Sequence, residues 1–426
     1  MDCFADDREA FKEYEKYFKS SYLSDVTLIV GGKKFPAHRL ILARGSDVFE
    51  RMLSSKWDGN KKEIELSEDS QCVDHFETFL KFFYFNHAVF NDTNALPLLI
   101  LADKYNFKGL QKVCIQYAIS YVLKEASLKD ILNVWFNYSS KACHSILIRE
   151  CVRIIASNMT KILTSEEWTD DWASLDRDQI TEILKSNDLI IPNEYLLYQS
   201  IQKWINAENS PERKGSTLTA TLIQILPWIR FPYMKAEELS ELEGTPLAQT
   251  HVKLFMPFTH TAFKYISLPL SLRTTSDFTT SQFLLRSYTD LSWDNRIVIT
   301  NEQLYERGVD HSFKISTRAS TVDPQTWNWT LKFTIASTVP NSHDQLKLNL
   351  ASDDIDHSRS VEYLISVVGE RKILRQVWGM KNFTKTRYHT DLDLQSKINV
   401  NELFSENSPL LVHGCLHLQL NLRPVL

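Results

Sequence analysis

The sequence is poor in the residues that mark several common protein classes. Only 11 glycines occur among the 426 residues, and the six cysteines form no Cys-x-x-Cys pair and no spacing typical of a metal site or a disulfide framework. No apolar run approaches the roughly 20 residues that a membrane-spanning helix needs. We therefore expect reduced, mostly buried thiols, no bound metal and no membrane partner.

The charge balance excludes a further class. Lys and Arg total 48 against 53 Asp and Glu, a net charge of −5, and the chain has no long basic block. Because sequence-independent binding of nucleic acid needs clustered cations that displace counterions, we expect no nucleic-acid partner. Residues 1–7 are acidic where a secretory signal would be basic and then apolar. The expected location is therefore the cytoplasm, or the nucleus, without a signal peptide.

The motifs of the common catalytic devices are missing from the sequence. It has no Gly-x-x-x-x-Gly-Lys-(Ser/Thr) phosphate loop, no Gly-x-Gly-x-x-Gly turn, no Gly-x-Ser-x-Gly elbow and no His-Glu-x-x-His zinc helix. We therefore expect no enzymatic activity, no catalytic residues and no cofactor. His38 could act as a base beside Asp25 or Arg39, but a packed, structural histidine at a helix start is the favoured interpretation.

Residues 24–42 combine a strand, a tight turn and a helix start in one order. Apolar residues alternate over 26–30, two glycines follow at 31–32, and Pro36 leads into an apolar run at 40–42. The pattern continues at 49–52, 63–66, 79–85 and 98–107. Together these segments resemble the BTB/POZ domain, a protein-interaction fold. The resemblance implies an α/β domain over residues 1–120.

A short amphipathic helix is expected before the first strand, over residues 6–20. Phe11, Tyr14 and Phe18 lie three and four residues apart and so share one helical face. This face could simply cover the core, but the resemblance favours a dimerisation helix. In BTB domains an Asp on the first strand and a basic residue after the His meet in a charged pocket near the dimer interface. The resemblance therefore implies a homodimer with Phe11, Tyr14, Phe18, Asp25 and Arg39 at its interface.

The same resemblance implies binding to cullin-3, a ubiquitin-ligase subunit. Cullin-binding BTB domains tend to carry a hydrophobic-x-Glu motif after the helix that holds Phe49, and the matching residues here are Trp57-Asp58-Gly59. The hydrophobic residue fits, but Gly59 replaces the glutamate, and Asp58 is the nearest carboxylate. The implied cullin-binding residues are Met52, Leu53, Trp57 and Asp58. The missing glutamate keeps open a second possibility, a scaffold that binds no cullin.

The apolar pattern is helical from about residue 127 to 243. Glu194 stands in the first turn of a helix whose apolar residues 196, 197, 201 and 204 share one face, and an Arg-Phe-Pro turn follows at 230–232. These two stretches resemble the BACK domain, the helical module that commonly follows BTB domains. The resemblance implies an all-α domain over residues 121–250 that acts as a spacer.

The apolar period changes from 3.6 to 2 beyond about residue 255. Apolar residues alternate with polar ones at 327–335, 346–350 and 416–422, with shorter candidates at 297–300, 313–318 and 361–368. Several short half-buried strands separated by turns predict an antiparallel β-sandwich or barrel over residues 251–426. Trp327 and Trp329 are expected in its core rather than on a binding platform. Partner recognition is expected at the turns 339–345 and 353–359 or at an open sheet edge.

No repeat near 50 residues with paired glycines occurs, which excludes a kelch propeller. The order BTB, BACK and β domain resembles BTB–BACK proteins without kelch repeats, whose C-terminal region is thought to be a TRAF-like β-sandwich. The chain is thus expected to be a multidomain α+β protein. The implied function is a dimeric adaptor, the substrate receptor of a cullin-3 ubiquitin ligase, whose β domain recruits an unknown client protein. The alternative is a non-catalytic homo-oligomeric scaffold.

Overall fold

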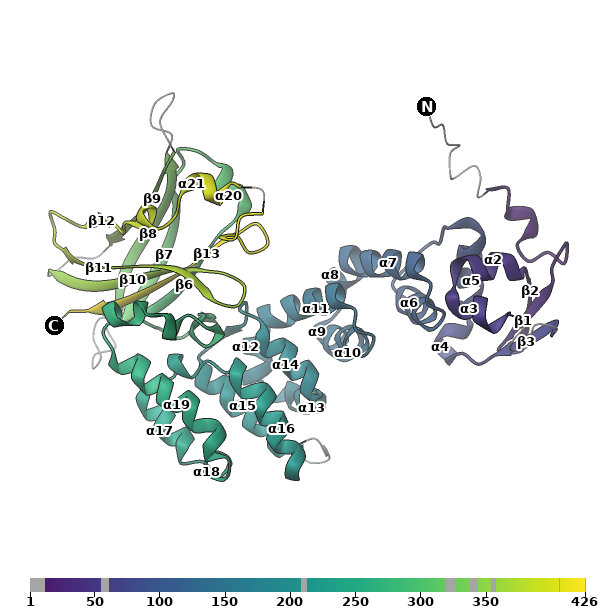
Figure 1. Cartoon of the computed structure of the whole chain (residues 1–426), viewed down its shortest axis with the longest axis horizontal. Helices are drawn as coiled ribbons and strands as arrows, with labels where there is room; N and C mark the ends of the chain where they lie inside the picture. The colour runs from purple at the N-terminus through teal and green to yellow at the C-terminus, as the bar shows by residue number, and fades with distance from the viewer. Residues whose placement is uncertain are drawn as a thin grey trace. The chain divides into compact units, whose positions relative to one another are not determined.

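The computed structural model of the chain describes residues 12–54, 61–207, 213–318, 326–336, 344–353, 358–405 and 407–425. The chain divides into two compact units, residues 1–151 and 152–426, and the boundary falls inside helix α11 (Ser145–Ser157). Each unit buries its own set of apolar side chains. Figure 1 shows both units coloured along the sequence.

Unit 1 opens with a small sheet of three strands in the order β2-β1-β3. Strands β1 (Val26–Val30) and β2 (Lys33–Ala37) form an antiparallel hairpin, whereas β3 (Glu63–Leu66) runs parallel to β1. Gly31 and Gly32 close the hairpin with φ angles of 52° and 77°, which glycine adopts without steric cost. The predicted strands and the glycine turn between them are therefore confirmed.

Short helices complete unit 1. They are α2 (Arg39–Gly45), α3 (Asp47–Met52), α4 (Ser70–Val73), α5 (Phe76–Phe85), α6 (Ala95–Lys104), α7 (Lys108–Tyr117), α8 (Leu123–Glu125), α9 (Leu128–Asp130), α10 (Asn137–Lys141) and the first part of α11, with π-helical turns η2 (Ala118–Val122) and η3 (Ile131–Phe136). Aromatic rings fill the space between the helices, and the rings of Phe49 and Tyr105 stack with centroids 4.4 Å apart. The segments 79–85 and 98–107, which carried the resemblance, lie on α5 and on α6 with the residues that follow it.

The predicted helix over residues 6–20 is wrong beyond Lys12. Residues 1–11, which include Phe11, lie outside the described residues. Lys12 is helical, but residues 13–20 form turns and the 3₁₀ segment η1 (Glu15–Tyr17). Lys19 then takes a positive φ of 54°, which is incompatible with a continuing helix. The chain reverses at the point where the sequence pattern predicted another helical turn.

Aromatic packing explains this reversal. The Phe18 ring lies edge-on against Tyr84 and Phe85 of α5, with centroids 5.5 and 5.6 Å apart. Tyr14 remains exposed. Tertiary contacts of one ring therefore override the helical spacing of the segment.

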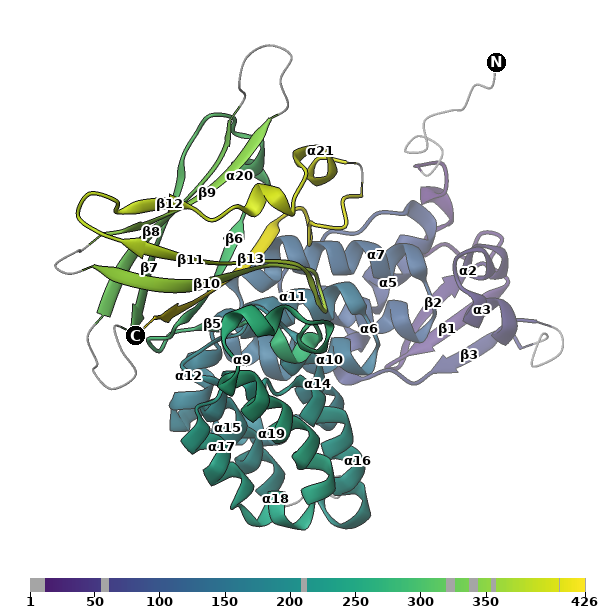
Figure 2. The ribbon, with the colours of Figure 1, turned by 60° about the vertical axis from the view of Figure 1, so that its left-hand side comes forward.

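Unit 2 begins with an array of helices that lie side by side in Figure 2. They are the remainder of α11, α12 (Met159–Thr164), α13 (Thr169–Ser174), α14 (Arg177–Lys185), α15 (Glu194–Asn206), α16 (Gly215–Ile225), α17 (Ala236–Glu243), α18 (Pro246–Thr250) and α19 (Val252–Ser267), with 3₁₀ turns η4 (Glu166–Trp168), η6 (Leu226–Trp228) and η7 (Phe231–Tyr233). Asn193 caps α15 by accepting a hydrogen bond from the Leu196 amide at 2.8 Å. The helical character predicted for 127–243 is confirmed.

The predicted change to strands at about residue 255 is wrong for the next thirty or so residues. Helix α19 continues to Ser267, and three 3₁₀ turns follow, η8 (Leu270–Thr274), η9 (Ser276–Phe278) and η10 (Ser281–Phe283). Phe255, Thr259 and Ala262 recur at helical spacing and are buried. Pro257 inside the helix hides this period from a reading of the sequence.

Two four-stranded sheets follow, in the orders β11-β10-β13-β6 and β12-β9-β8-β7, and every pair within them is antiparallel. Their strands are β6 (Asp294–Ile299), β7 (His311–Arg318), β8 (Thr326–Ala336), β9 (Gln345–Ser352), β10 (Arg359–Val368), β11 (Ile373–Phe383), β12 (His389–Asp391) and β13 (Leu416–Pro424). Side chains of both sheets meet in one core, which makes the domain a β-sandwich (Figures 1 and 2). Three short helical segments also border it, α20 (Asn301–Tyr305), η11 (Leu394–Ser396) and α21 (Val400–Leu403).

The alternation read from the sequence matches the faces of the strands. Trp329, Leu331, Phe333 and Ile335 of β8 are fully buried, and so are the leucines of β9 and β13. Trp327 is partly buried, with the Arg359 guanidinium 4.9 Å above its ring. The tryptophans therefore belong to the core, as predicted. Strand β11 was not predicted.

The sandwich and the helical array share a second, smaller core. Tyr265 of α19 packs with Phe278 and Phe283 and with Val368 and Ile373 on the outer face of one sheet. Strand β4 (Ile190–Ile191), next to α15, pairs in parallel with β5 (Ser287–Tyr288), just before the sandwich. Unit 2 therefore combines helices and sandwich in one body. No described helix of either unit has the length and apolar character needed to cross a membrane.

Candidate interaction sites

Asp25 and Arg39 lie next to each other, but not as the predicted pair of side chains. The Asp25 carboxylate is exposed and accepts a hydrogen bond from the Arg39 backbone N–H at 2.8 Å, at the start of α2. The Arg39 guanidinium instead donates to the carbonyl oxygens of Leu53 at 3.0 Å and Lys61 at 2.6 Å. Asp25 thus caps a helix, and Arg39 holds backbone carbonyls, including that of Asp25 itself at 3.4 Å.

The carbonyls of Leu53 and Lys61 flank the segment assigned to cullin binding. Trp57 and Asp58 lie outside the described residues, so the structure says nothing of their side chains. Met52 is half-buried at the end of α3, whereas Leu53 is buried in the core and offers little surface to a partner. Arg39 ties together both ends of this segment, a role that no sequence pattern indicated.

His38 is held by two hydrogen bonds in the interior of unit 1. Its Nε2 lies 3.0 Å from the Tyr22 carbonyl oxygen, and its Nδ1 lies 2.9 Å from the Tyr84 hydroxyl. A carbonyl can only accept, so Nε2 carries the proton and Nδ1 accepts from Tyr84. Burial raises the pKa of Tyr84 to about 12, which keeps the phenol protonated. The interpretation of His38 as a packed, structural histidine is confirmed.

Three exposed apolar residues lie close in sequence to His38 or to its partner Tyr22. Tyr22, Leu23 and Leu40 have side chains that are 61%, 67% and 82% exposed. The Tyr22 carbonyl binds His38, Leu23 follows Tyr22, and Leu40 lies two residues after His38. No motif in the sequence singled out these residues. The Tyr-Leu pair just before the first strand was the available signal, since neither residue has a place in the strand or in a helix. Large exposed apolar residues that cluster are typical of interaction surfaces.

In unit 2, the two segments that resemble a BACK domain meet in a buried polar network. Glu194 Oε1 accepts hydrogen bonds from the Arg230 backbone N–H at 2.8 Å and from the Arg286 guanidinium, while Oε2 accepts from the Tyr288 hydroxyl at 2.9 Å. The side chains of Glu194 and Arg286 are fully buried. Burial, and next the Glu194 charge, raise the pKa of Tyr288 well above its usual value.

The arginines of this network bind backbone on both sides. Arg230 donates to Asn187 Oδ1 at 2.5 Å and to the Leu284 carbonyl, and Arg286 donates to the carbonyls of Leu184 and Trp228 at 2.5 and 3.0 Å. Burial, followed by repulsion from Arg286, lowers the pKa of Arg230 to about 9. Residues 284–288, which lead into the sandwich, are thereby fixed to the helices.

Comparison with models of known protein families identifies the first two domains. The BTB/POZ domain model matches residues 14–121, and the model described as BTB And C-terminal Kelch, or BACK, matches residues 131–243. The chain is a BTB–BACK protein. The buried network therefore joins the BACK domain to the β-sandwich.

Relatives of this BTB–BACK protein extend the similarity beyond the two domains. BTB/POZ domain-containing protein 17 of Xenopus tropicalis is 23% identical over 415 residues, which cover 92% of this chain and 84% of the relative. The human protein of that name is 24% identical over 323 residues, 74% of this chain and 64% of the relative. Human Kelch-like protein 5 is 23% identical over 264 residues, 61% of this chain and 32% of the relative.

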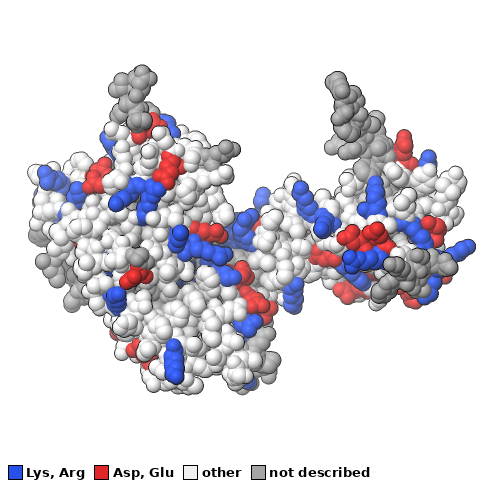
Figure 3. Space-filling view, in the orientation of Figure 1, with Lys and Arg blue, Asp and Glu red and all other residues white. Residues whose placement is uncertain are grey.

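The described surface of the BTB–BACK protein has mixed charge. On the face shown in Figure 3, Lys and Arg side chains form separate groups with Asp and Glu among them. Among the described residues, no three His, Cys, Asp or Glu side chains are placed to hold a metal ion. The turns expected to recognise partners, 339–345 and 353–359, lie mostly outside the described residues. An open sheet edge is therefore the remaining candidate within the described sandwich.

The BACK–sandwich unit should lose stability in acid through His417 of β13. Burial, and next the Arg296 guanidinium whose Nη2 lies 3.0 Å from Nδ1, lower the pKa of His417 from 6.5 to about 4. Between pH 6.5 and 4, His417 is protonated in the unfolded chain but stays neutral in the folded chain. Its contribution to stability is therefore fully present above pH 6.5 and is lost as the pH falls toward 4. With allowance for partial exposure, we expect a loss of about 1–2 kcal/mol between pH 6.5 and 4.5.

Denaturant unfolding of unit 2, followed at several pH values, measures this slope. His417→Gln should flatten it because glutamine still accepts from Arg296 but does not titrate. His389→Gln, at an exposed histidine of the same domain, is the matched control and should leave the slope unchanged. An equal slope in the His417 variant and the unmodified protein would show that His417 is not its source.

Proposed function

We propose that the chain is a dimeric protein-interaction adaptor, the substrate receptor of a cullin-3 ubiquitin ligase, in the cytoplasm or nucleus. In this proposal the BTB domain binds a second copy and the cullin, and the sandwich recruits a client protein. The observation that carries it is the fusion of a BTB–BACK pair to a β-sandwich through a buried network. Such an arrangement places a separate binding domain on an oligomerising one.

We further propose domain limits of 1–120 for the BTB domain, 121 to about 267 for BACK, and the remainder for the β domain. The BACK limit moves from 250 because α19 packs against α17 and η7. We also propose that the sandwich is TRAF-like. Its pairing orders support this, since two four-stranded antiparallel sheets share one core.

The dimer interface is proposed to include the exposed group Tyr22, Leu23 and Leu40 together with the predicted Phe11, Tyr14, Phe18, Asp25 and Arg39. Leu23→Glu combined with Leu40→Glu should turn a dimer into a monomer, because each buried charge would lack a partner. Light scattering at micromolar concentration measures the mass. Val89→Glu, at an apolar side chain of the same unit that is 71% exposed, is the matched control and should stay dimeric. A monomeric unmodified protein would refute the dimer.

Cullin-3 binding is proposed to depend on Trp57 as its anchor, with Met52, Leu53 and Asp58 in support. A tryptophan anchor commonly contributes at least about 2 kcal/mol, so Trp57→Ala should weaken binding by more than about tenfold while the dimer persists. Gly59→Glu restores the missing carboxylate and should strengthen binding. Calorimetry of the full chain with the N-terminal region of cullin-3 measures both effects.

The non-catalytic scaffold is the second candidate, and the specific observation in its favour is Gly59 in place of glutamate. Calorimetry with cullin-3 also distinguishes the scaffold from the ligase receptor. If neither the unmodified chain nor Gly59→Glu binds the cullin at tens of micromolar, while light scattering shows a dimer, the scaffold replaces the ligase receptor.

A further inference from the structure

Strand β11 forms an open edge of the sandwich. It is eleven residues long and pairs with β10 on one side, and within the described residues no strand pairs with its other side. Near its start, the Ile373 amide donates to the Thr279 carbonyl at 2.8 Å, which closes the edge there. From Gln376 onward, no described backbone group bonds to the free side of β11. An edge strand of this length presents unpaired N–H and C=O groups to a further strand.

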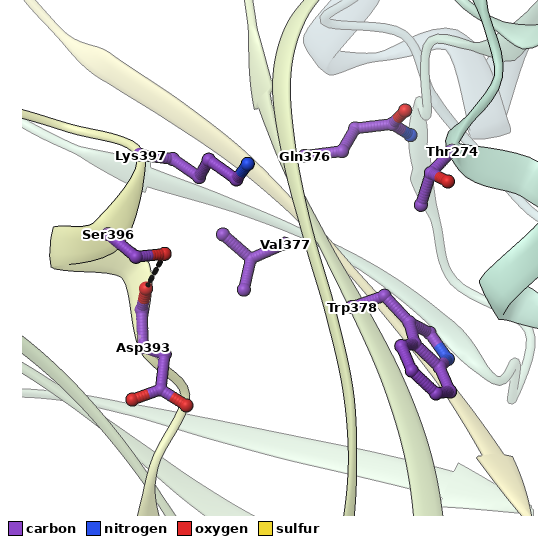
Figure 4. Close-up of a pocket in the computed structure, with 7 residues that line it drawn as sticks. All are labelled: Thr274, Gln376, Val377, Trp378, Asp393, Ser396 and Lys397. Carbon is purple, nitrogen blue, oxygen red and sulfur yellow. Dashed lines mark hydrogen bonds between the residues drawn. The ribbon is translucent and has the colours of Figure 1, made fainter.

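A hollow of about 520 Å³ lies against this open stretch. It is lined by Gln376, Val377 and Trp378 of β11, by Asp393, Ser396 and Lys397 beside η11, and by Thr274 at the end of η8. Figure 4 shows Gln376 and Trp378 directed toward the side of Thr274, and Val377 toward the side of η11. The edge of β11 is thus flanked by η11 on one side and, on the other, by the segment that connects BACK to the sandwich.

Trp378 is a fixed aromatic side chain beside the hollow. Its indole Nε1 donates to Glu362 Oε1 at 2.6 Å, and the same oxygen accepts from the Ser271 backbone N–H at 3.1 Å. The side chain is nevertheless 44% exposed. An aromatic ring held in place before binding loses little freedom when a partner covers it, which is the property of an interface anchor.

The charge around this edge is opposite to that of the chain. Residues 371–397 contain seven Lys and Arg against two Asp, and the adjacent carboxylates of Glu362 and Glu402 bring the charge around the edge to +3, in a chain of net charge −5. Two of the cations are engaged, since Arg375 binds Glu402 and Lys381 lies 3.9 Å from Asp393. Lys397 carries no ion pair among the described residues, and in Figure 4 its side chain extends toward Gln376. A partner with complementary charge at this basic edge would be acidic.

We propose that the free edge of β11, from Gln376 to Asn382, binds an extended acidic segment of the client protein as an added strand. The backbone of β11 supplies the pairing, Trp378 the apolar anchor, and Lys397 with neighbouring cations the preference for acidic side chains. The inference rests on the proposed adaptor function and names the partner chemistry of its sandwich. Thr274 makes the site a product of the BACK–sandwich junction, because η8 belongs to the connecting segment.

The test uses the full chain and a synthetic peptide of about twelve residues in which Glu and Thr alternate with Val. Fluorescence anisotropy should give a dissociation constant of about 10–100 µM, typical of a short added strand without optimised side chains. The same peptide with Lys in place of Glu should bind at least about tenfold more weakly. Methylation of alternate backbone nitrogens along the pairing edge should abolish binding because it removes the hydrogen bonds.

Variants locate the site. Trp378→Ala and Lys397→Glu should each weaken the acidic peptide by about fivefold or more, whereas Lys347→Glu, an exposed lysine on β9 of the other sheet, should not. Hydrogen exchange of residues 376–382 should slow when the peptide is bound. Equal binding of Glu and Lys peptides, or unchanged binding in the Trp378 variant, would overturn the proposal.

Two other outcomes also contradict it. If no peptide binds, the cations serve only to protect the edge from unwanted pairing. If Trp378→Ala instead removes a concentration-dependent self-association, a second copy occupies the edge. Cullin-3 binding, measured on the same samples, separates the hypotheses: peptide failure with cullin binding intact rejects only the edge site, and the reverse result rejects only the ligase receptor.

Discussion

Glu194→Gln should lower the free energy of unfolding of residues 152–426 by about 3–5 kcal/mol. The substitution leaves the Arg286 guanidinium charged and fully buried without its carboxylate partner. It also weakens the bonds from Tyr288 and the Arg230 amide, which join α15 to the entrance of the sandwich. Because the network spans both parts, the BACK helices and the sandwich should unfold together at the lower denaturant concentration.

Chemical denaturation followed by circular dichroism and by tryptophan fluorescence measures this change. Glu182→Gln is the matched control, since Glu182 forms a surface ion pair with Lys185 at 2.6 Å and should cost no more than about 0.5 kcal/mol. Two well-separated transitions in the unmodified protein would contradict the view that the network couples the two parts. A Glu194 variant as stable as the control would contradict its energetic role.

Trp329→Ala should destabilise the sandwich by about 3–5 kcal/mol. Trp329 is fully buried between the sheets, with its ring 5.2 Å from that of Phe383. Its indole Nε1 donates to Thr317 Oγ1 at 3.0 Å, so the substitution leaves both a cavity and a buried hydroxyl without its donor. The midpoint of thermal unfolding should fall correspondingly.

Trp378→Ala supplies the comparison within the same domain. Its side chain is largely at the surface, and we expect a cost of about 1 kcal/mol or less. The two tryptophans therefore separate stability from recognition: the first should unfold the sandwich, and the second should leave it folded while impairing peptide binding. Equal destabilisation by both variants would show that Trp378 belongs to the core.

The BTB hairpin was predictable because its signals are local. Gly31-Gly32 has few alternatives to a tight turn, and the apolar alternation on both sides sets the register of β1 and β2. The strands of the sandwich that face one core were predictable for the same reason. Local chemistry and burial agree at these positions.

Strand β11 and helix α19 were not predicted because their sequences do not show the regular apolar pattern that is typical of a half-buried strand or helix. Arg375 and Lys381 lie on the face of β11 that includes the buried Val377, yet they reach Glu402 and Asp393 beside the sandwich. The alternation is therefore broken by residues whose partners are remote in sequence. In α19, Pro257 conceals a buried helical face.

The candidate sites depended still more on long-range contacts. Glu194 and Arg286 are 92 residues apart, and only one of them lies in a segment that resembles a known motif. Asp25 and Arg39 were paired by resemblance, but the structure gives the guanidinium of Arg39 to carbonyls near the segment 55–60. The sequence shows which residues are charged, but which groups they bind depends on contacts between distant segments that only the folded structure reveals.

The junction between BACK and the sandwich also limits how an adaptor of this design could work. Arg286, at the entrance of the sandwich, binds the carbonyls of Leu184, Ser186 and Trp228 and the carboxylate of Glu194. Arg230, in the helical array, binds the Leu284 carbonyl of the entrance segment, so the sandwich is fixed to the helices at this point. A client held by the sandwich would move only as the BACK helices move.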